Sequence, residues 1–286
     1  LRLLTLPKDV VNLIEIGKIT QGHAKVLVGM ENANLLAKKI VEKKLSVRQA
    51  ENLVNLFKKP KKVKLISKDS NLKDLENLIK REKTKYFESK PSMATRQCSS
   101  AAIESITSIL PQLIGGSADL AASTKQIISD SIYSYENRSG QSIEFGIREH
   151  AMAAVVNGIT LHSNLIGFGS TFLVFSDYMR PSIRLASLMN LNSVYIFTHD
   201  SIYLGEDGPT HQPVEHLMSL RLIPGLDVIR PANSLETQYA YQYIFTRNNN
   251  PKSLVLTRQS IDYVETNLSY KNFQDGAYEL CEGDDI

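Results

Sequence analysis

The sequence predicts an α/β fold in which helices cover a parallel sheet, preceded by a small all-α appendage at the N-terminus. Two observations predict the sheet: short apolar runs end repeatedly in polar or glycine-rich turns, and helical stretches separate several of these runs. A third observation predicts the appendage, because residues 1–57 show helical periodicity throughout and no strand-like run.

The helices of the appendage are expected between local start and stop signals. Pro7 and Gly17 bound the first helix, and Thr20 is placed to cap the second. Ser46 followed by Gln49 has the spacing of a capping box, which marks the start of the last helix. Four helices are therefore predicted, over residues 8–16, 22–30, 34–44 and 46–57.

A basic linker is expected over residues 58–92, where lysines are frequent and apolar residues are few. The charge is divided unevenly along the chain. Residues 1–90 hold 21 basic and 10 acidic residues, a net charge of +11, whereas residues 91–286 hold 12 and 20, a net charge of −8. This division indicates two pieces with different partners.

The second piece is expected to hold the sheet over residues 93–265. Its apolar runs lie at residues 111–120, 142–150, 164–172, 193–200, 226–232 and 252–259. Helices are expected over 151–162 and 177–189. Ligand sites in parallel sheets gather at the carboxyl ends of the strands, so the residues that follow these runs are candidates for a site.

The composition excludes several classes of protein. With 286 residues and 42% hydrophobic residues, the chain has an ordinary globular composition. Its two cysteines, Cys98 and Cys281, lie far apart in the sequence, which argues against a disulfide scaffold or a zinc site. No apolar run is long enough for a transmembrane helix, so no membrane contact and a cytoplasmic location are expected.

Polar and aromatic residues are concentrated after the predicted strands. Each taken alone has an ordinary structural explanation: a glutamate before an alanine-rich helix, for example, interacts favourably with the helix dipole. Their joint placement at strand ends nevertheless indicates a site. The set comprises Asp119, Ser123, Glu149, His150, Phe172, Phe175, His199, Asp200, Asp207, His211 and Arg258.

Residues 93 to about 260 resemble the pyrimidine-binding domain of transketolase, a thiamine-diphosphate enzyme. The resemblance rests on the motifs MATRQ, LIGGSADLAAS, FGIREHAMAAVVNGI, FGSTFLVFSDYMRPSIRLASLM, THDSIYLGEDGPTHQPVEHL, IPGLDVIRPA and LVLTRQ. It implies the transfer of a two-carbon ketol unit between sugar phosphates. The sequence departs from the family at Tyr203, where a glycine is usual.

The resemblance implies roles for matching residues. Glu149 would hydrogen-bond the aminopyrimidine ring of the cofactor, and Phe172, Phe175 and Tyr178 would form the aromatic pocket around that ring. Asp119 would lie near the cofactor at a dimer interface. The substrate-binding groups would be Arg96, Ser123, His199 and Arg258 for the sugar phosphate, with Asp207 and His211 for the hydroxyls. Glu149 and His211 would be the catalytic residues.

The same resemblance implies that half of the cofactor site comes from elsewhere. In transketolase a separate domain with a Gly-Asp-Gly motif holds the diphosphate and Mg²⁺, and this sequence has no such motif. Residues 266–286 are expected to begin the linker to a further domain that the sequence does not contain. The isolated chain is therefore expected to be inactive, and a homodimer or a separate chain with the diphosphate-binding domain is the expected partner.

Residues 1 to about 55 resemble the central helical domain of the chromosome-partition protein ParB. The motifs are LRLLTLP, GHAKVLVGM and LSVRQAENLV. The sequence starts within the expected recognition helix, so weak, salt-dependent, non-specific DNA contact is expected rather than sequence-specific binding. Two alternatives to an enzyme remain: a DNA-associated module whose α/β part serves for oligomerisation, and a decayed fusion without catalytic function.

Overall fold

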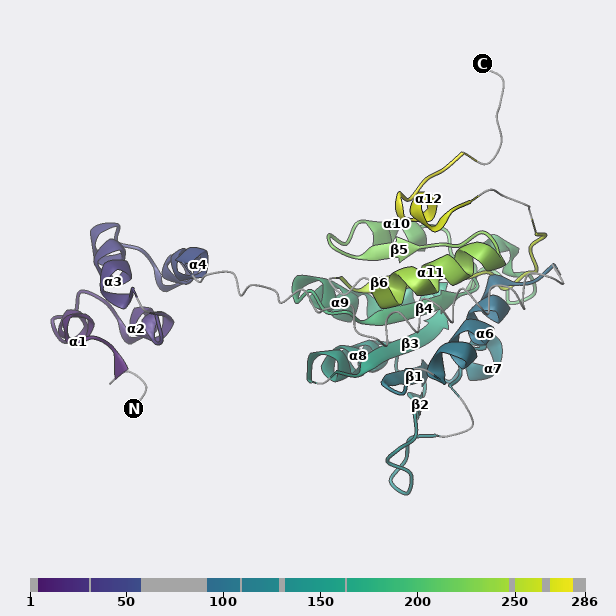
Figure 1. Ribbon diagram of the computed structural model, residues 1–286, viewed down its shortest axis with the longest axis horizontal. Coiled ribbons are helices and arrows are strands. Elements are labelled where there is room, and N and C mark those ends of the chain that lie inside the picture. The colour runs from purple at the N-terminus through teal and green to yellow at the C-terminus, as the bar shows by residue number, and fades with distance from the viewer. Residues whose placement is uncertain are drawn as a thin grey trace, which may run out of the picture. The chain divides into compact units, whose positions relative to one another are not determined.

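The structure is a computed structural model of the chain, and it consists of two compact units, residues 1–67 and 68–286. Each unit is described by itself (Figure 1). The described residues are 5–30, 32–57, 92–108, 110–128, 132–162, 164–246, 250–263 and 268–279. The linker expected at 58–92 lies outside them, except for Ser92.

The N-terminal unit is a small helical bundle, as predicted. Its described helices are α1 (Lys8–Glu15), α2 (Gln21–Leu27), α3 (Ala33–Glu42) and α4 (Val47–Phe57). The predicted capping box is present: the Ser46 backbone N–H donates to Gln49 Oε1 at 2.9 Å, and the Gln49 N–H donates to Ser46 Oγ at 3.3 Å. Apolar side chains from the four helices, Leu27 and Leu36 among them, form one buried cluster.

The C-terminal unit contains a six-stranded sheet of strand order β2-β1-β3-β4-β6-β5. Every neighbouring pair is parallel. The strands are β1 (Leu113–Ser117), β2 (Ser142–Glu144), β3 (Ile166–Phe172), β4 (Val194–Thr198), β5 (Asp227–Ile229) and β6 (Lys252–Val255). Each strand lies within one of the predicted apolar runs, so the predicted parallel sheet is confirmed.

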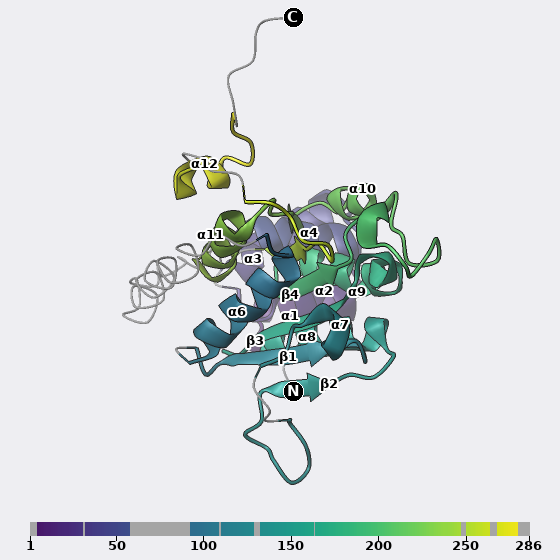
Figure 2. The ribbon, with the colours of Figure 1, turned by 90° about the vertical axis from the view of Figure 1, so that its right-hand side faces the viewer.

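Helices cover both faces of the sheet, as Figure 2 shows. One layer holds α6 (Thr95–Thr107) and α11 (Ser234–Thr246); the other holds α8 (Glu149–His162), α9 (Ser176–Leu188) and α10 (His216–Arg221). Shorter elements are α7 (Ala121–Thr124), α12 (Tyr270–Gln274), and the 3₁₀ turns η2 (Leu173–Phe175) and η3 (Ile202–Leu204).

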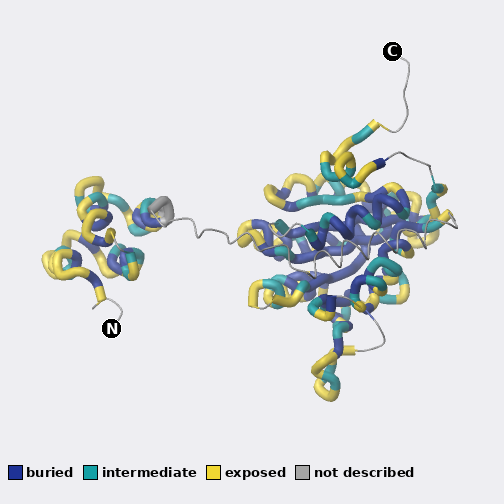
Figure 3. The backbone as a smooth tube through the Cα atoms, in the orientation of Figure 1, coloured by how far each residue is buried: buried dark blue, intermediate teal, exposed yellow. Residues whose placement is uncertain are grey.

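Side chains of the central strand β4 alternate between the two layers, as a pleated strand requires. Val194 and Ile196 join the cluster of α6 and α11, whereas Tyr195 and Phe197 join the cluster of α8 and α9. Strands that are buried on both faces consist of continuous apolar runs, which is why they could be predicted from the sequence. Figure 3 shows the sheet as the buried centre of this unit.

Glycine in β1 permits a close approach to β3. A Cβ atom at Gly115 would lie 2.1 Å from the carbonyl oxygen of Phe168, so no larger residue fits without moving a strand. At the margin of the unit, Met93 and Ile261 form an antiparallel bridge that joins its N-terminal and C-terminal segments. Among the described residues, no helix is long and apolar enough to cross a membrane.

Candidate functional site

Two residues at the carboxyl edge of the sheet have a backbone conformation that is unusual for non-glycine residues. Asp119, just after β1, has φ 58°, and His199, the residue after β4, has φ 60°. Such conformations cost on the order of 1–3 kcal/mol and persist where the surrounding structure enforces them, which is common at functional sites. Both residues belong to the predicted set, and both strands end at the same edge of the sheet.

A pair of buried threonines brings two arginines together at this edge. Thr95 begins α6, and Thr257 follows β6. The Thr95 backbone N–H donates to Thr257 Oγ1 at 3.0 Å, and the Thr257 N–H donates to Thr95 Oγ1 at 2.8 Å. Because Arg96 and Arg258 directly follow these threonines, the paired backbones place both guanidinium groups at one site.

The charge of this arginine pair is only partly compensated. Arg96 Nη1 donates to the carbonyl oxygen of Ser123 at 2.6 Å, whereas its buried Nε has no hydrogen-bond partner in the described structure. Burial lowers the pKa of Arg96, Arg258 lowers it further, and Asp207 opposes these effects. Two guanidinium groups held close together suit an anion such as a phosphate.

The site also contains a group of aromatic rings, which begins at the end of β3. The rings of Phe172 and Phe175 are stacked, with centroids 5.8 Å apart and an interplanar angle of 10°. Tyr178 stacks on Phe175 at 6.1 Å. The His211 ring meets Phe172 and Phe175 edge-on, at 6.0 and 5.5 Å. These residues therefore form one cluster that can pack against a flat ring.

His199 joins the aromatic cluster to the charged groups. Its ring lies on Phe172 with a centroid distance of 3.7 Å, and its Nδ1 is 2.8 Å from Thr198 Oγ1. Its Nε2 lies 4.0 Å from a carboxylate oxygen of Asp207. Burial, together with Arg96 and Arg258, lowers the pKa of His199 to about 4, against the opposing effect of Asp207. The imidazole is therefore neutral near pH 7.

Glu149 is the first residue of α8 and is only 8% exposed. Helix α8 approaches β3 closely because Gly169 leaves room for Met152; a Cβ at Gly169 would lie 2.9 Å from Met152 Cγ. A buried carboxyl group at a helix N-terminus is largely shielded from water. It can exchange a proton or a hydrogen bond with a bound ligand.

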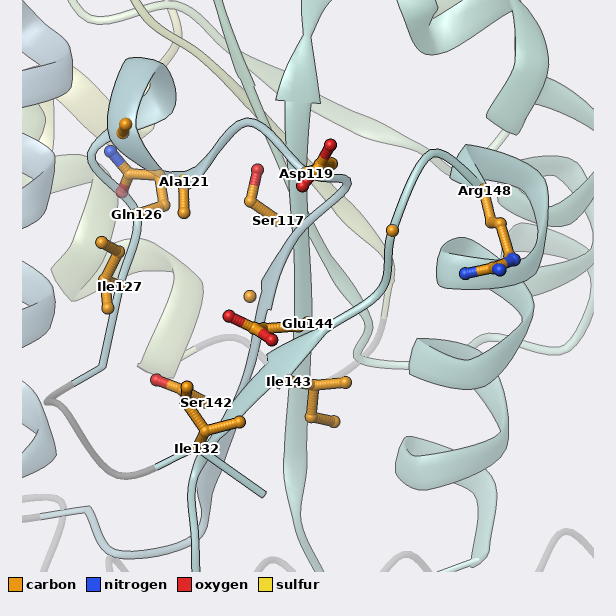
Figure 4. A pocket seen from close by; sticks show the side chains of 13 residues that line it. Ser117, Asp119, Ala121, Gln126, Ile127, Ile132, Ser142, Ile143, Glu144 and Arg148 are labelled. Atoms are coloured by element: carbon orange, nitrogen blue, oxygen red, sulfur yellow. The ribbon is translucent and has the colours of Figure 1, made fainter. Parts of the chain in front are cut away.

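A cavity of about 660 Å³ opens beside the ends of β1 and β2. Figure 4 shows Ser117, Asp119 and Glu144 directing oxygen atoms into it, with Gln126 on one wall and Arg148 set further apart. Asp119 was predicted as a site residue from the sequence, whereas Glu144 was not. The cavity wall therefore carries two carboxylates, Asp119 and Glu144, and one guanidinium group, Arg148.

Other strand-end residues have structural contacts. The side chain of Asp200 is 1% exposed and accepts hydrogen bonds from Arg230 Nη2 and Nε at 2.7 and 3.0 Å, which joins the ends of β4 and β5. His150 contacts Ser182 Oγ at 3.3 Å. Tyr203 lies in η3 with an exposed side chain, and it is not among the residues with positive φ, so the phenol fits its backbone there without strain.

The structure thus groups the predicted residues into neighbouring parts of one sheet edge. One part holds Arg96, His199, Asp207, His211 and Arg258, which act on one another electrostatically. Ser123 contributes its carbonyl oxygen to this part. The residues that sequence reasoning missed are Thr95, Thr198, Thr257 and Glu144. The repeated Thr-Arg dipeptide was the available signal for two of them.

Comparison with known families assigns the α/β unit. Residues 91–262 match the family described as the pyrimidine binding domain of transketolase. The chain belongs to this family. Residues 1–59 match the ParB HTH domain, so both expected resemblances are confirmed.

The transketolases that the chain resembles are much longer than the matched region. It is 49% identical to the transketolase of Halalkalibacterium halodurans over 198 residues, which cover 68% of this chain and 30% of that protein. With the transketolase of Mycobacterium leprae it is also 49% identical, over 203 residues, 67% of this chain and 29% of that protein. The chain thus spans about a third of the length of these relatives.

Solved transketolase structures show the same fold. The structure of Pichia stipitis transketolase in complex with sedoheptulose 7-phosphate matches with a TM-score of 0.66 and 32% identity, over 88% of this chain and 38% of that one. A split-gene transketolase described as an inactive β4 tetramer matches with a TM-score of 0.50 and 26% identity, over 62% of this chain and 55% of that one.

Proposed function

We propose that residues 93–265 form the substrate-binding and pyrimidine-binding half of a thiamine-diphosphate-dependent enzyme that transfers a two-carbon ketol unit between sugar phosphates. The main support for this proposal is that two features lie at the same edge of the sheet. A stacked aromatic pair suits a flat heteroaromatic ring, and a pair of neighbouring arginines suits a phosphate.

The residues present fit the pyrimidine end of the cofactor. Phe172 and Phe175 offer parallel ring faces, and Tyr178 extends the stack. Glu149, buried at the start of α8, is the group proposed to hold a proton at the ring nitrogen. Thiamine diphosphate, when bound, supplies the carbon nucleophile of ketol transfer. Asp119, in the neighbouring cavity, is proposed to lie on the cofactor side.

The substrate phosphate is proposed to bind Arg96 and Arg258, beside the loop that holds Ser123. His199 is neutral near pH 7 and offers a hydrogen bond without adding a third charge to the arginine pair. Asp207, whose side chain is 42% exposed, and His211 are proposed to contact the hydroxyl groups of the sugar. His211 also borders the ring cluster, which supports a proposed position between cofactor and substrate.

The diphosphate and Mg²⁺ are proposed to be held by a different domain, because the sequence lacks the Gly-Asp-Gly motif that this role requires in the resembled family. A separate polypeptide is one source of that domain. The likeness to a split-gene transketolase supports this arrangement, since that protein divides its sequence between chains.

A second copy of this chain is proposed as a further partner. The outward faces of α8 and α9 carry large apolar side chains: Leu161 is 61% exposed and Leu185 52% exposed. Between His150 and His162, helix α8 contains no acidic or basic residue other than these two histidines. An exposed helix face normally carries charge, so the uncharged apolar face of α8 indicates an interface. The split-gene relative is described as a tetramer.

Activity measurements on the purified chain test the enzyme proposal. The chain is assayed with thiamine diphosphate, Mg²⁺, a ketose phosphate as donor and an aldose phosphate as acceptor of the two-carbon unit, alone and mixed with the diphosphate-binding half of the H. halodurans transketolase. Turnover is expected only in the mixture, and Glu149→Gln should abolish it. Equal turnover by the mixture with Glu149→Gln would exclude the proposed role of Glu149, and robust turnover by the chain alone would exclude a half-site.

A second function is proposed for the N-terminal unit: weak, salt-dependent contact with DNA. Residues 1–59 match the ParB HTH domain, and the exposed residues of its described helices include Lys8, Lys25, Lys38 and Arg48. Fluorescence anisotropy with two unrelated duplexes should show equal affinities that fall steeply with salt. A preference for one duplex would instead indicate sequence-specific binding, and no binding at low salt would exclude the function.

A further inference from the structure

We propose that Thr198 is a positioning residue that fixes His199 as the tautomer with its proton on Nε2, so that His199 acts as a neutral hydrogen-bond donor to the substrate. The inference rests on the proposed function only in its last step, the contact with a substrate oxygen. The tautomer itself follows from contacts within the chain, and it can be tested without any ligand.

The imidazole of His199 is held from two sides. Thr198 is the last residue of β4, and the sheet register pairs it with Phe172 at the end of β3. The left-handed backbone of His199 follows directly. As a result the ring lies on Phe172 at 3.7 Å while its Nδ1 meets Thr198 Oγ1 at 2.8 Å. Turning the ring over would place a C–H group against the threonine hydroxyl and lose this hydrogen bond.

The groups around Nε2 decide which nitrogen carries the proton. A threonine hydroxyl can donate or accept, so the contact with Thr198 permits either tautomer. With the proton on Nδ1, the lone pair of Nε2 would face the carboxylate of Asp207 at 4.0 Å, which is repulsive. With the proton on Nε2, the N–H faces that carboxylate, and Thr198 donates to Nδ1. The Asp207 carboxylate therefore favours the second arrangement.

The surroundings also disfavour the doubly protonated ring. The charged and titratable groups that act on it are Arg96 from α6, Arg258 after β6, and Asp207 and His211 in the segment after η3. The effects of burial and of the two arginines exceed that of Asp207 and hold the pKa of His199 at about 4. At neutral pH, then, His199 can donate from Nε2 to an oxygen beside the arginine pair and cannot accept a proton there.

Nitrogen-15 NMR of the full chain labelled in histidine tests the tautomer, with His199→Gln used to assign the signals. The expected spectrum has a protonated, pyrrole-type Nε2 and an unprotonated, pyridine-type Nδ1 for His199 at pH 7. A proton on Nδ1, or a doubly protonated ring, would overturn the proposal. This measurement needs only the wild-type chain and the assignment variant.

Substitutions then separate positioning from a general structural role. Thr198→Ser keeps the hydroxyl and should keep the spectrum, whereas Thr198→Val should give a mixture of tautomers or ring orientations. Thr171→Val is the matched control, because Thr171 is buried in the adjacent strand and its hydroxyl has no hydrogen-bond partner among the described residues. An unchanged His199 spectrum in Thr198→Val would contradict the role of Thr198.

Calorimetric titration with inorganic phosphate tests the last step. Thr198→Val should bind phosphate about three- to tenfold more weakly than wild type, because only a fraction of the molecules present the competent ring. Thr198→Ser and Thr171→Val should bind like wild type. If the wild-type chain binds no phosphate, the proposed substrate site fails while the tautomer result stands. If Thr198→Val changes the spectrum and binds phosphate as wild type does, His199 is not the donor.

Discussion

Replacing Arg258 by glutamine should weaken phosphate binding without destabilising the fold. A hydrogen bond to a charged group contributes about 1.5–3 kcal/mol, which corresponds to a change of about 10- to 150-fold in Kd. Arg258 is exposed to solvent, so screening places the expected effect at the lower end, about tenfold. Stability should hold or rise slightly, because Arg258 lowers the pKa of Arg96 and its removal relieves that repulsion.

The assay is isothermal titration with inorganic phosphate at two salt concentrations, with urea unfolding run on the same samples. Arg221→Gln is the control, since this exposed arginine lies on α10 and lines a different cavity. The weakening should be largest at low salt and should be absent from the control. Equal weakening of phosphate binding by both variants would show that the effect comes from the net charge of the chain alone. A clear loss of stability with unchanged phosphate binding would show that the arginine pair does not bind the anion.

Three further predictions concern stability and assembly. The pKa of His199 is lowered from its ordinary value of 6.5 to about 4, so the unfolded chain binds more protons than the folded chain between these pH values. The free energy of unfolding should therefore fall as the pH decreases from 6.5 to 4, by up to about 3 kcal/mol. His199→Gln should remove this part of the pH dependence in urea titrations, and an unchanged profile would contradict the assignment. The double variant Leu161→Asp and Leu185→Asp should be a monomer in sedimentation experiments in which the wild-type chain is an oligomer. The control His162→Asp, at the same exposed helix end, should remain an oligomer. A wild-type chain that is already monomeric would exclude the proposed interface. Gly115→Ala should destabilise the chain by more than about 3 kcal/mol, because the new Cβ atom would clash with the carbonyl oxygen of Phe168. A Cβ atom at Gly158 would have no neighbour within 4 Å, so Gly158→Ala should change stability by about 1 kcal/mol or less.

The sheet could be predicted from the sequence because its strands are buried on both faces and therefore form continuous apolar runs. Helix α11 could not be found in the same way. Most of its residues are buried, polar ones such as Glu236 and Gln242 among them, so its sequence lacks the alternation of an amphipathic helix. The helical bundle at the N-terminus was predicted from capping signals such as Ser46 and Gln49, which act locally and need no tertiary context.

The site could be predicted as a set of residues but not as an arrangement. Arg96 and Arg258 are neighbours because of the hydrogen bonds between Thr95 and Thr257, which are 162 residues apart in the sequence. No local pattern contains that contact. The contact between Thr198 and the His199 ring joins adjacent residues. It nevertheless depends on the left-handed backbone at His199 and on Phe172 from the next strand. The pairing of β3 with β4 places Phe172 opposite Thr198.

This chain is proposed to supply the pyrimidine half of a thiamine-diphosphate site. The most direct measurement is a calorimetric titration of thiamine diphosphate with Mg²⁺ into the 286-residue chain, into the diphosphate-binding half of the H. halodurans transketolase, and into their mixture. Tight binding is expected only in the mixture, with clear weakening by Phe172→Ala or Glu149→Gln. Equally tight binding by the chain alone, or by a mixture containing either variant, would contradict it.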